Sequence, residues 1–144
     1  MKNTIICIKG SNQTGKTPTI RDIYGKIASE EEKSNNANYL HPYKDIEDDI
    51  ILYKGIKIGF YGCGDPGYLQ YEHVSDLIKK GCQIIICSCR NWGQTRNDIH
   101  EAATEYNYDL IYTSTYQSPS GLQDFLRENF VIALITLVDS CINR

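Results

Sequence analysis

The sequence predicts an α/β fold: one domain over residues 1–144, in which helices cover both faces of a mostly parallel sheet and so make three layers. Two observations lead to this prediction. Apolar, β-rich runs alternate along the chain with segments whose apolar residues recur at helical spacing. A glycine-containing loop joins the first such run to the first such segment, as in a βα unit. A chain of 144 residues is long enough for one substantial core.

The first predicted strand and helix flank this glycine loop. Residues 4–8 form an apolar run that is typical of a strand. The apolar residues that follow share one helical face and predict a helix from Lys16 to about Ser29; they are Ile20, Ile23, Tyr24 and Ile27. Residues 30–38 are polar and aperiodic, so a solvated linker is expected there.

A hairpin is predicted next. Two short apolar runs, residues 50–53 and 56–61, flank the dipeptide Lys54-Gly55. A two-residue connection that ends in glycine is a hairpin signal, because the tight turn requires a left-handed backbone. One edge strand of the sheet is therefore expected to be antiparallel.

The rest of the chain predicts an alternation of helices and strands. Helical spacing of apolar residues covers residues 71–80, and apolar runs at 83–87 and 110–113 indicate two further strands. Capping patterns that start at Thr95 and Ser120 predict the remaining two helices. With the hairpin, these elements make a five-stranded sheet.

Composition narrows the function classes. The formal net charge is −3 and the sequence shows no stripe of Lys and Arg, so a nucleic-acid partner is not expected. The longest apolar run, residues 130–138, is under half a membrane span, and the N-terminus lacks the flanks of a signal peptide. We therefore expect a cytoplasmic protein without a membrane partner.

The six cysteines are expected to be packing residues. Cys7, Cys82, Cys87 and Cys89 lie in or beside apolar runs, where a free thiol behaves as a small hydrophobic group. Their spacing matches no common zinc motif, which favours packing. Metal binding or redox chemistry is the alternative. Reduced thiols fit the cytoplasm.

The most informative motif lies in residues 10–17, which match the phosphate-binding pattern G-x-x-x-x-G-K-S/T between a predicted strand and a predicted helix. Glycine lets the backbone approach a phosphate, so the N–H groups of residues 13–17 can surround the β-phosphate. Lys16 would reach the β- and γ-phosphates, and the Thr17 hydroxyl would bind Mg²⁺. The predicted phosphate-binding residues are Gly10, Gln13, Thr14, Gly15, Lys16 and Thr17.

On this motif the chain resembles the P-loop (Walker A) NTPase superfamily, and as a whole it resembles uncharacterised small P-loop ATP-binding proteins of bacterial or phage type. A hairpin before the third strand is similar to the small GTPase branch of that superfamily. The resemblance implies a P-loop fold with strand order 2-3-1-4-5. It also places the nucleotide at the carboxyl ends of strands 1 and 3.

The turn Gly64-Asp65-Pro66-Gly67 after the third strand supplies a second candidate. P-loop proteins usually hold the Mg²⁺ shell with an acid at the end of a strand near the loop, which implies Asp65 as a metal residue. Gly67 would then offer its N–H to the γ-phosphate. The spacing Asp-x-Gly departs from the Asp-x-x-Gly of small GTPases, and an ordinary turn is the alternative.

Arg90 and Arg96 bracket a loop after the fourth strand, on the expected phosphate edge. Either arginine would stabilise the charge that develops in phosphoryl transfer; unpaired surface arginines are the alternative. Gln70 and Glu72 are candidates for orienting a water molecule. Trp92 could stack on a base, with ordinary packing as the alternative. The three histidines match no catalytic spacing and are treated as background.

These residues support three functions. The leading one is a Mg²⁺-dependent ATPase with Lys16, Arg90 and Arg96 as catalytic residues; no guanine-recognition motif Asn-Lys-x-Asp is present, so ATP is favoured over GTP. The second is a kinase that acts on a nucleoside or another small-molecule acceptor. The third is a nucleotide-sensing scaffold that has a protein partner or forms a homodimer through the last helix.

Overall fold

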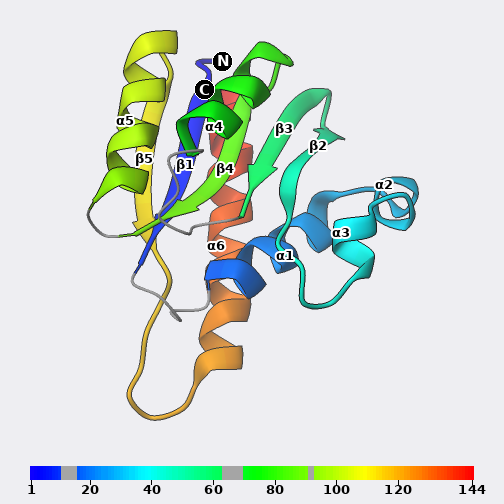
Figure 1. Cartoon of the computed structure of the whole chain (residues 1–144). Coiled ribbons are helices and arrows are strands. Elements are labelled where there is room, and N and C mark those ends of the chain that lie inside the picture. Colours follow the sequence, from blue (N-terminus) through cyan, green and yellow to red (C-terminus); the bar gives the residue numbers. More distant parts are fainter. Residues whose placement is uncertain (11–15, 63–69, 91–92) are drawn as a thin grey trace.

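The computed structural model describes residues 1–10, 16–62, 70–90 and 93–144 (Figure 1). Its elements, in chain order, are β1 (Thr4–Lys9), α1 (Lys16–Ile27), α2 (Glu30–Ser34), α3 (Ala37–Leu40), β2 (Glu47–Tyr53), β3 (Ile56–Tyr61), α4 (Gln70–Lys79), β4 (Ile84–Cys89), α5 (Gln94–Tyr106), β5 (Asp109–Ser114) and α6 (Gln123–Asn143).

The five strands form one sheet in the order β2-β3-β4-β1-β5. β1 is parallel to β4 and β5, β3 is parallel to β4, and β2 is antiparallel to β3 at the edge. The α/β class, the mostly parallel sheet and the antiparallel edge strand are thus confirmed.

The predicted strand order, 2-3-1-4-5, is wrong, because β4 rather than β1 lies beside β3. β1 and β4 are both almost completely buried, as strands with a neighbour on each side must be. Their apolar patterns are equivalent, so the local sequence could not decide which of them is next to β3. The parallel register, in which Thr4 pairs with Ile84 and Lys9 with Cys89, is set by tertiary packing.

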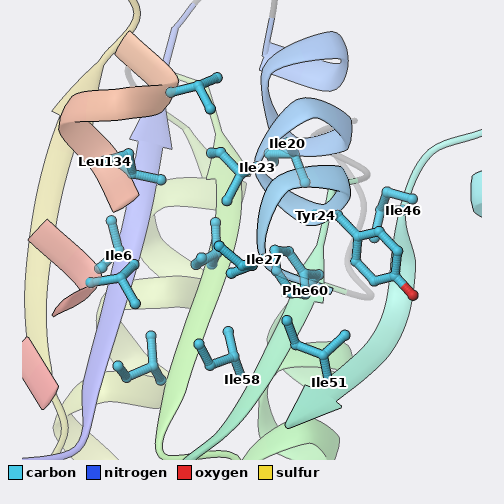
Figure 2. Close-up of a cluster of buried hydrophobic side chains, with 14 of the residues drawn as sticks. Ile6, Ile20, Ile23, Tyr24, Ile27, Ile46, Ile51, Ile58, Phe60 and Leu134 are labelled. Carbon is cyan, nitrogen blue, oxygen red and sulfur yellow. The ribbon is translucent and has the colours of Figure 1, made fainter. Parts of the chain in front are cut away.

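Helices cover both faces of the sheet, which gives the predicted three layers (Figure 1). Alternate residues of each strand point to opposite faces, so one run of buried residues supplies two cores. Ile6, Ile58 and Phe60 pack against α1 and α6, as Figure 2 shows for the α1 side chains Ile20, Ile23, Tyr24 and Ile27 and for Leu134 of α6. Ile5, Cys7, Ile85 and Cys87 pack on the other face against α4 and α5.

The hairpin prediction is confirmed. Lys54 and Gly55 have φ angles of 51° and 79°, the left-handed pair that a two-residue turn requires. Tyr53 and Ile56 on either side of the turn are paired, and β2 and β3 continue from them.

The prediction of a solvated linker at residues 30–38 is wrong, because two short helices, α2 and α3, occupy most of this segment. The Ser29 hydroxyl accepts the N–H of Glu32, and the Glu32 carboxylate accepts the N–H of Ser29, which makes a capping box. Arg21 of α1 holds this region by donating to the carbonyl oxygens of Asn38, Tyr39 and Lys44 at 2.6–3.0 Å.

Three helix boundaries also differ from the predictions. α1 ends at Ile27, α5 begins at Gln94 with Gly93 at its N-cap, and α6 begins at Gln123 rather than after a Ser120 cap. Of the helices described, none is long and apolar enough to cross a membrane.

Candidate functional site

The carboxyl ends of the parallel strands β1, β3 and β4 meet at one edge of the sheet (Figure 1). Gly10 follows β1, and its N–H donates to the carbonyl oxygen of Cys89, the last residue of β4, at 3.1 Å. The first residue of the phosphate-binding motif is therefore fixed beside the end of β4. Gly10 itself is buried.

The motif continues into α1, whose first two residues are Lys16 and Thr17. The connection from Gly10 to Lys16 is short, so the N-terminus of α1 lies at the same sheet edge. A helix N-terminus in general favours an anion. Pro18 occupies the first helical turn, in which a missing N–H leaves no intrahelical bond unmade. The buried side chains of α1 fix this helix against the sheet.

The end of β4 also holds both ends of the segment between β3 and α4. The Ser88 hydroxyl donates to the carbonyl oxygen of Gly62 at 3.3 Å, and the Gln70 amide donates to the carbonyl oxygen of Ser88 at 3.0 Å. Ser88 and Gln70 are 0% and 1% exposed. Gly62, Ser88 and Gln70 thus tie β3, β4 and α4 together beside Gly10.

Gln70 was one of two candidates for orienting water. Its amide nitrogen is used in the bond to Ser88, while its amide oxygen is buried and has no hydrogen-bond partner among the described residues. The side chain is therefore a buried tie between α4 and β4 with one acceptor left over. Glu72, the other candidate, lies in the first turn of α4.

The structure separates the two predicted arginines. Arg90 follows β4 directly and is half-buried at the same edge as Gly10. Arg96 is exposed on α5, and its guanidinium lies 5.4 Å from the ring centre of Tyr112 on β5. β1, which leads into the motif, lies between β4 and β5. Arg90 after β4 and Arg96 against β5 therefore lie on opposite sides of the motif.

Lys9 is a basic residue that sequence reasoning missed. It ends β1 immediately before Gly10, and its ammonium group lies 5.0 Å from the ring centre of Tyr112, on which Arg96 also lies. Burial raises the pKa of Tyr112, and the nearby Arg96 opposes this shift. The sequence did contain a signal for Lys9, namely its place directly before the motif, because a lysine that ends a buried strand lies at the edge of the sheet.

Five predicted site residues lie outside the described part of the chain: Gln13, Thr14, Gly15, Asp65 and Gly67. Trp92 also lies outside it. For Lys16 and Thr17, the structure gives their place in α1. The predicted metal residues Thr17 and Asp65 thus stay predictions.

A hollow of about 720 Å³ lies elsewhere, between α2, α3 and the free edge of β2. Its lining includes Glu31, Glu32 and Asp49, and burial raises the pKa of the Asp49 carboxyl. Carboxylates repel phosphate groups, so this hollow does not suit a nucleoside triphosphate. The basic residues of the chain's candidate site, in contrast, lie at the ends of β1 and β4.

No protein-family model matches the chain, and no curated protein matches it.

Proposed function

We propose that the chain is a nucleoside-triphosphate-binding protein, and specifically a small Mg²⁺-dependent ATPase. One observation carries the proposal: the complete motif G-x-x-x-x-G-K-T spans the connection from β1 to α1. A strand, this loop and a helix together make the known phosphate cradle. The P-loop fold and a cytoplasmic location are part of the proposal.

The phosphates would lie at the N-terminus of α1. The N–H groups of residues 13–17 and the Lys16 ammonium group would bind the β- and γ-phosphates, with Gly10 providing the close approach. Gly67 would donate its N–H to the γ-phosphate. Bound Mg²⁺ would neutralise phosphate charge, and the place of Thr17 in the first helical turn suits an oxygen ligand to it, with Asp65 as the second residue.

Arg90 is the better of the two catalytic arginines. It follows the strand whose last carbonyl group binds Gly10, whereas Arg96 lies over Tyr112 on the other side of β1. A guanidinium beside the phosphates stabilises the negative charge that spreads over the transferring group. We therefore assign transition-state stabilisation to Arg90, and only a lesser, electrostatic role to Arg96.

A second candidate, nucleotide sensing, is favoured by Arg21. This residue lies one helical turn after Thr17 and donates to three carbonyl groups between residues 38 and 44. A shift of α1 on nucleotide binding would reach α3 through these bonds. Phe125 and Ile132, 62% and 57% exposed on α6, support the homodimer that this scaffold function includes.

Thermal unfolding with Mg-ATP and with Mg-GTP tests nucleotide binding. A ligand at one hundred times its Kd adds about 2.7 kcal/mol to the free energy of unfolding. At about 2–4 °C per kcal/mol, the midpoint should rise by about 5–11 °C with ATP. Lys16→Ala should abolish the rise, while Lys26→Ala, which changes an exposed residue in the last turn of the same helix, should keep it. No rise with either nucleotide would contradict the proposal.

Phosphate release then separates turnover from sensing. Arg90→Ala should lower kcat by about 10²–10³-fold, as for loss of one preorganised donor, with a much smaller effect of Arg96→Ala. Binding without phosphate release would favour the sensing scaffold. Release only in the presence of an added acceptor, with the phosphate found on that acceptor, would favour the kinase alternative.

A further inference from the structure

A second group of chemically active side chains lies at the same sheet edge, beside β3 rather than β1. Glu47 and Asp48 begin β2, and His73 lies in the first turn of α4. One ligand atom from each of the three lies within 4.8 Å of the other two. Glu47 pairs with Tyr61, the last residue of β3, which places the group at the carboxyl end of that strand.

The backbone of β2 is bent in a way that brings the two carboxylates together. Consecutive residues of a regular strand point to opposite faces, so Glu47 and Asp48 would normally diverge. The register shifts between Glu47 and Asp49, and Asp48 has a left-handed φ of 56°. A bulge of this kind redirects a side chain. Here the Asp48 carboxylate contacts the imidazole, and a Glu47 carboxylate oxygen lies within 4.8 Å of the other two ligand atoms.

The imidazole of His73 is held from two sides. Its Nδ1 lies 2.8 Å from each carboxylate oxygen of Asp48. The ring of Tyr61 stacks on it with centres 4.3 Å apart and planes 13° from parallel. The side chains of His73 and Asp48 are 23% and 33% exposed, so they are largely fixed and still reachable from solvent.

The group carries negative charge that no direct lysine or arginine ion pair among the described residues offsets. Within the described residues, neither Glu47 nor Asp48 forms an ion pair with a lysine or arginine, and Asp48 pairs with His73 only. The next acid, Asp49, is used elsewhere and accepts the N–H of Glu47 at 3.0 Å. With a neutral imidazole, the two carboxylates give a charge of −2, which a divalent cation would balance.

We propose that Glu47, Asp48 and His73 form a binding site for a divalent first-row transition-metal ion. Two carboxylate oxygens and one imidazole nitrogen suit Zn²⁺ or Mn²⁺ better than Mg²⁺, which prefers oxygen ligands alone. Two ligand atoms about 2.05 Å from one ion are about 2.9 Å apart at a right angle and about 3.3 Å apart in a tetrahedral site. The 2.8 Å between Nδ1 and the Asp48 oxygens therefore needs to widen only slightly to admit an ion.

The ion would take the place of the hydrogen bond between His73 and Asp48. Metal ligation by Nδ1 requires its lone pair, so the ring proton moves to Nε2, or one proton is released when the imidazole is charged. Three protein ligands leave coordination positions for water or for an oxygen of a substrate. The site does not depend on the proposed nucleotide binding, and its ion is distinct from the nucleotide Mg²⁺.

The test is a titration of the metal-free full chain with Co²⁺, followed by its d–d absorption, and with Zn²⁺, followed by calorimetry, both without nucleotide. We expect one equivalent of Co²⁺ to bind and Zn²⁺ to displace it. In a Cys63→Ser background, which removes the cysteine outside the described residues, we expect no thiolate-to-cobalt band, because the described cysteines are buried. His73→Gln and Asp48→Asn should each weaken binding by at least about tenfold. Asn is chosen because it accepts the left-handed backbone at position 48.

Two matched variants complete the test. His100→Gln changes an exposed histidine on α5, and Lys16→Ala removes the proposed phosphate lysine; both should bind metal as the wild type does. The proposal is overturned if the wild type shows no saturable binding, if a thiolate band appears in the Cys63→Ser background, or if folded Asp48→Asn binds as tightly as wild type. Should His73→Gln fail to fold, the Zn²⁺-induced shift of the His73 imidazole resonances in the wild type decides: a shift supports the site and none overturns it.

Discussion

The two faces of the sheet are built from different residues, although the same strands supply both. The face toward α1 and α6, here the α1–α6 face, is filled by large side chains, such as Phe60 and a series of isoleucines. The face toward α4 and α5, the α4–α5 face, is filled in large part by small ones, among them Cys7, Cys87 and Ala102.

The difference shows two ways of reaching close packing. On the α1–α6 face, Tyr24 and Phe60 meet edge to face with ring centres 5.3 Å apart, so large side chains fill the space between the sheet and the helices. On the α4–α5 face, the Cys7 and Cys89 sulfurs are 3.0 Å apart, and burial is the main cause that raises the pKa of Cys7. The first face should be most sensitive to lost volume and the second to added volume or charge.

Truncation of Phe60 should give the largest effect. Phe60 is fully buried, and Phe60→Ala should lower the free energy of unfolding by about 3–5 kcal/mol and the thermal midpoint by about 6–20 °C. Phe125→Ala, which truncates an aromatic ring that is 62% exposed on α6, is the matched control and should change stability by about 0.5 kcal/mol or less. Equal losses for the two variants would contradict the role given to volume on the α1–α6 face.

Alkaline pH should destabilise the α4–α5 face next most strongly. Burial raises the pKa of Cys82 from 9.0 to about 11. Below pH 9 the thiol is protonated in both states; between pH 9 and 11 the unfolded chain loses this proton while the folded chain keeps it. Stability therefore falls as the pH rises through this window, by about 2–3 kcal/mol for this group.

Urea unfolding under reducing conditions checks this. The difference in stability between wild type and Cys82→Ala should shrink across the window, because the variant lacks the titrating thiol. A difference that stays constant with pH would show that Cys82 does not resist ionisation in the folded state.

Added volume on the same face should cost somewhat less. A Cβ at Gly59 would lie 2.9 Å from the Cys82 sulfur and 3.1 Å from a methyl group of Leu77. Gly59→Ala should therefore lower the free energy of unfolding by about 1–3 kcal/mol, measured by urea denaturation. In a double-mutant cycle, Cys82→Ala should relieve part of that loss. Strict additivity of the two changes would rule out this contact as the cause.

The smallest effect is expected for the charged contact between α1 and α6. The Arg127 guanidinium lies 2.9 Å from the Asp22 carboxylate, but both groups are partly exposed. Asp22→Asn should cost less than about 1 kcal/mol, and the difference should vanish near 1 M salt. A larger loss that persists in salt would mean that charge, rather than buried volume, holds these helices together.

The sequence was sufficient for features that depend on neighbouring residues. Lys54-Gly55 predicted the hairpin because two left-handed residues in a row determine a turn. The apolar spacing from Ile20 to Ile27 predicted the buried face of α1, since that face depends on helical periodicity alone. For the same reason the Gly-Lys-Thr motif could be placed between a strand and a helix.

Features that depend on distant residues could not be predicted. α2 and α3 form in a polar segment, where the Ser29 capping box and the bonds from Arg21 stabilise them. His73 appeared isolated in the sequence, because its partner Asp48 is 25 residues away and reaches it only through the bulge in β2. The insertion of β4 between β3 and β1 likewise depends on packing. The pairing of β4 with β1 is what places Arg90, which follows Cys89, nearer to Gly10 than Arg96 is.

The Glu32 carboxylate has a consequence for how the molecule behaves in a crowded solution. While one of its oxygens accepts the N–H of Ser29, the other accepts the outward N–H of Leu52 on β2, at 2.9 Å. Leu52 is 64% exposed on the outermost strand, where an open row of N–H groups would recruit a strand from another molecule. Because the Glu32 carboxylate already accepts this N–H, the N–H is not available to pair with a strand of another molecule, which disfavours edge-to-edge aggregation.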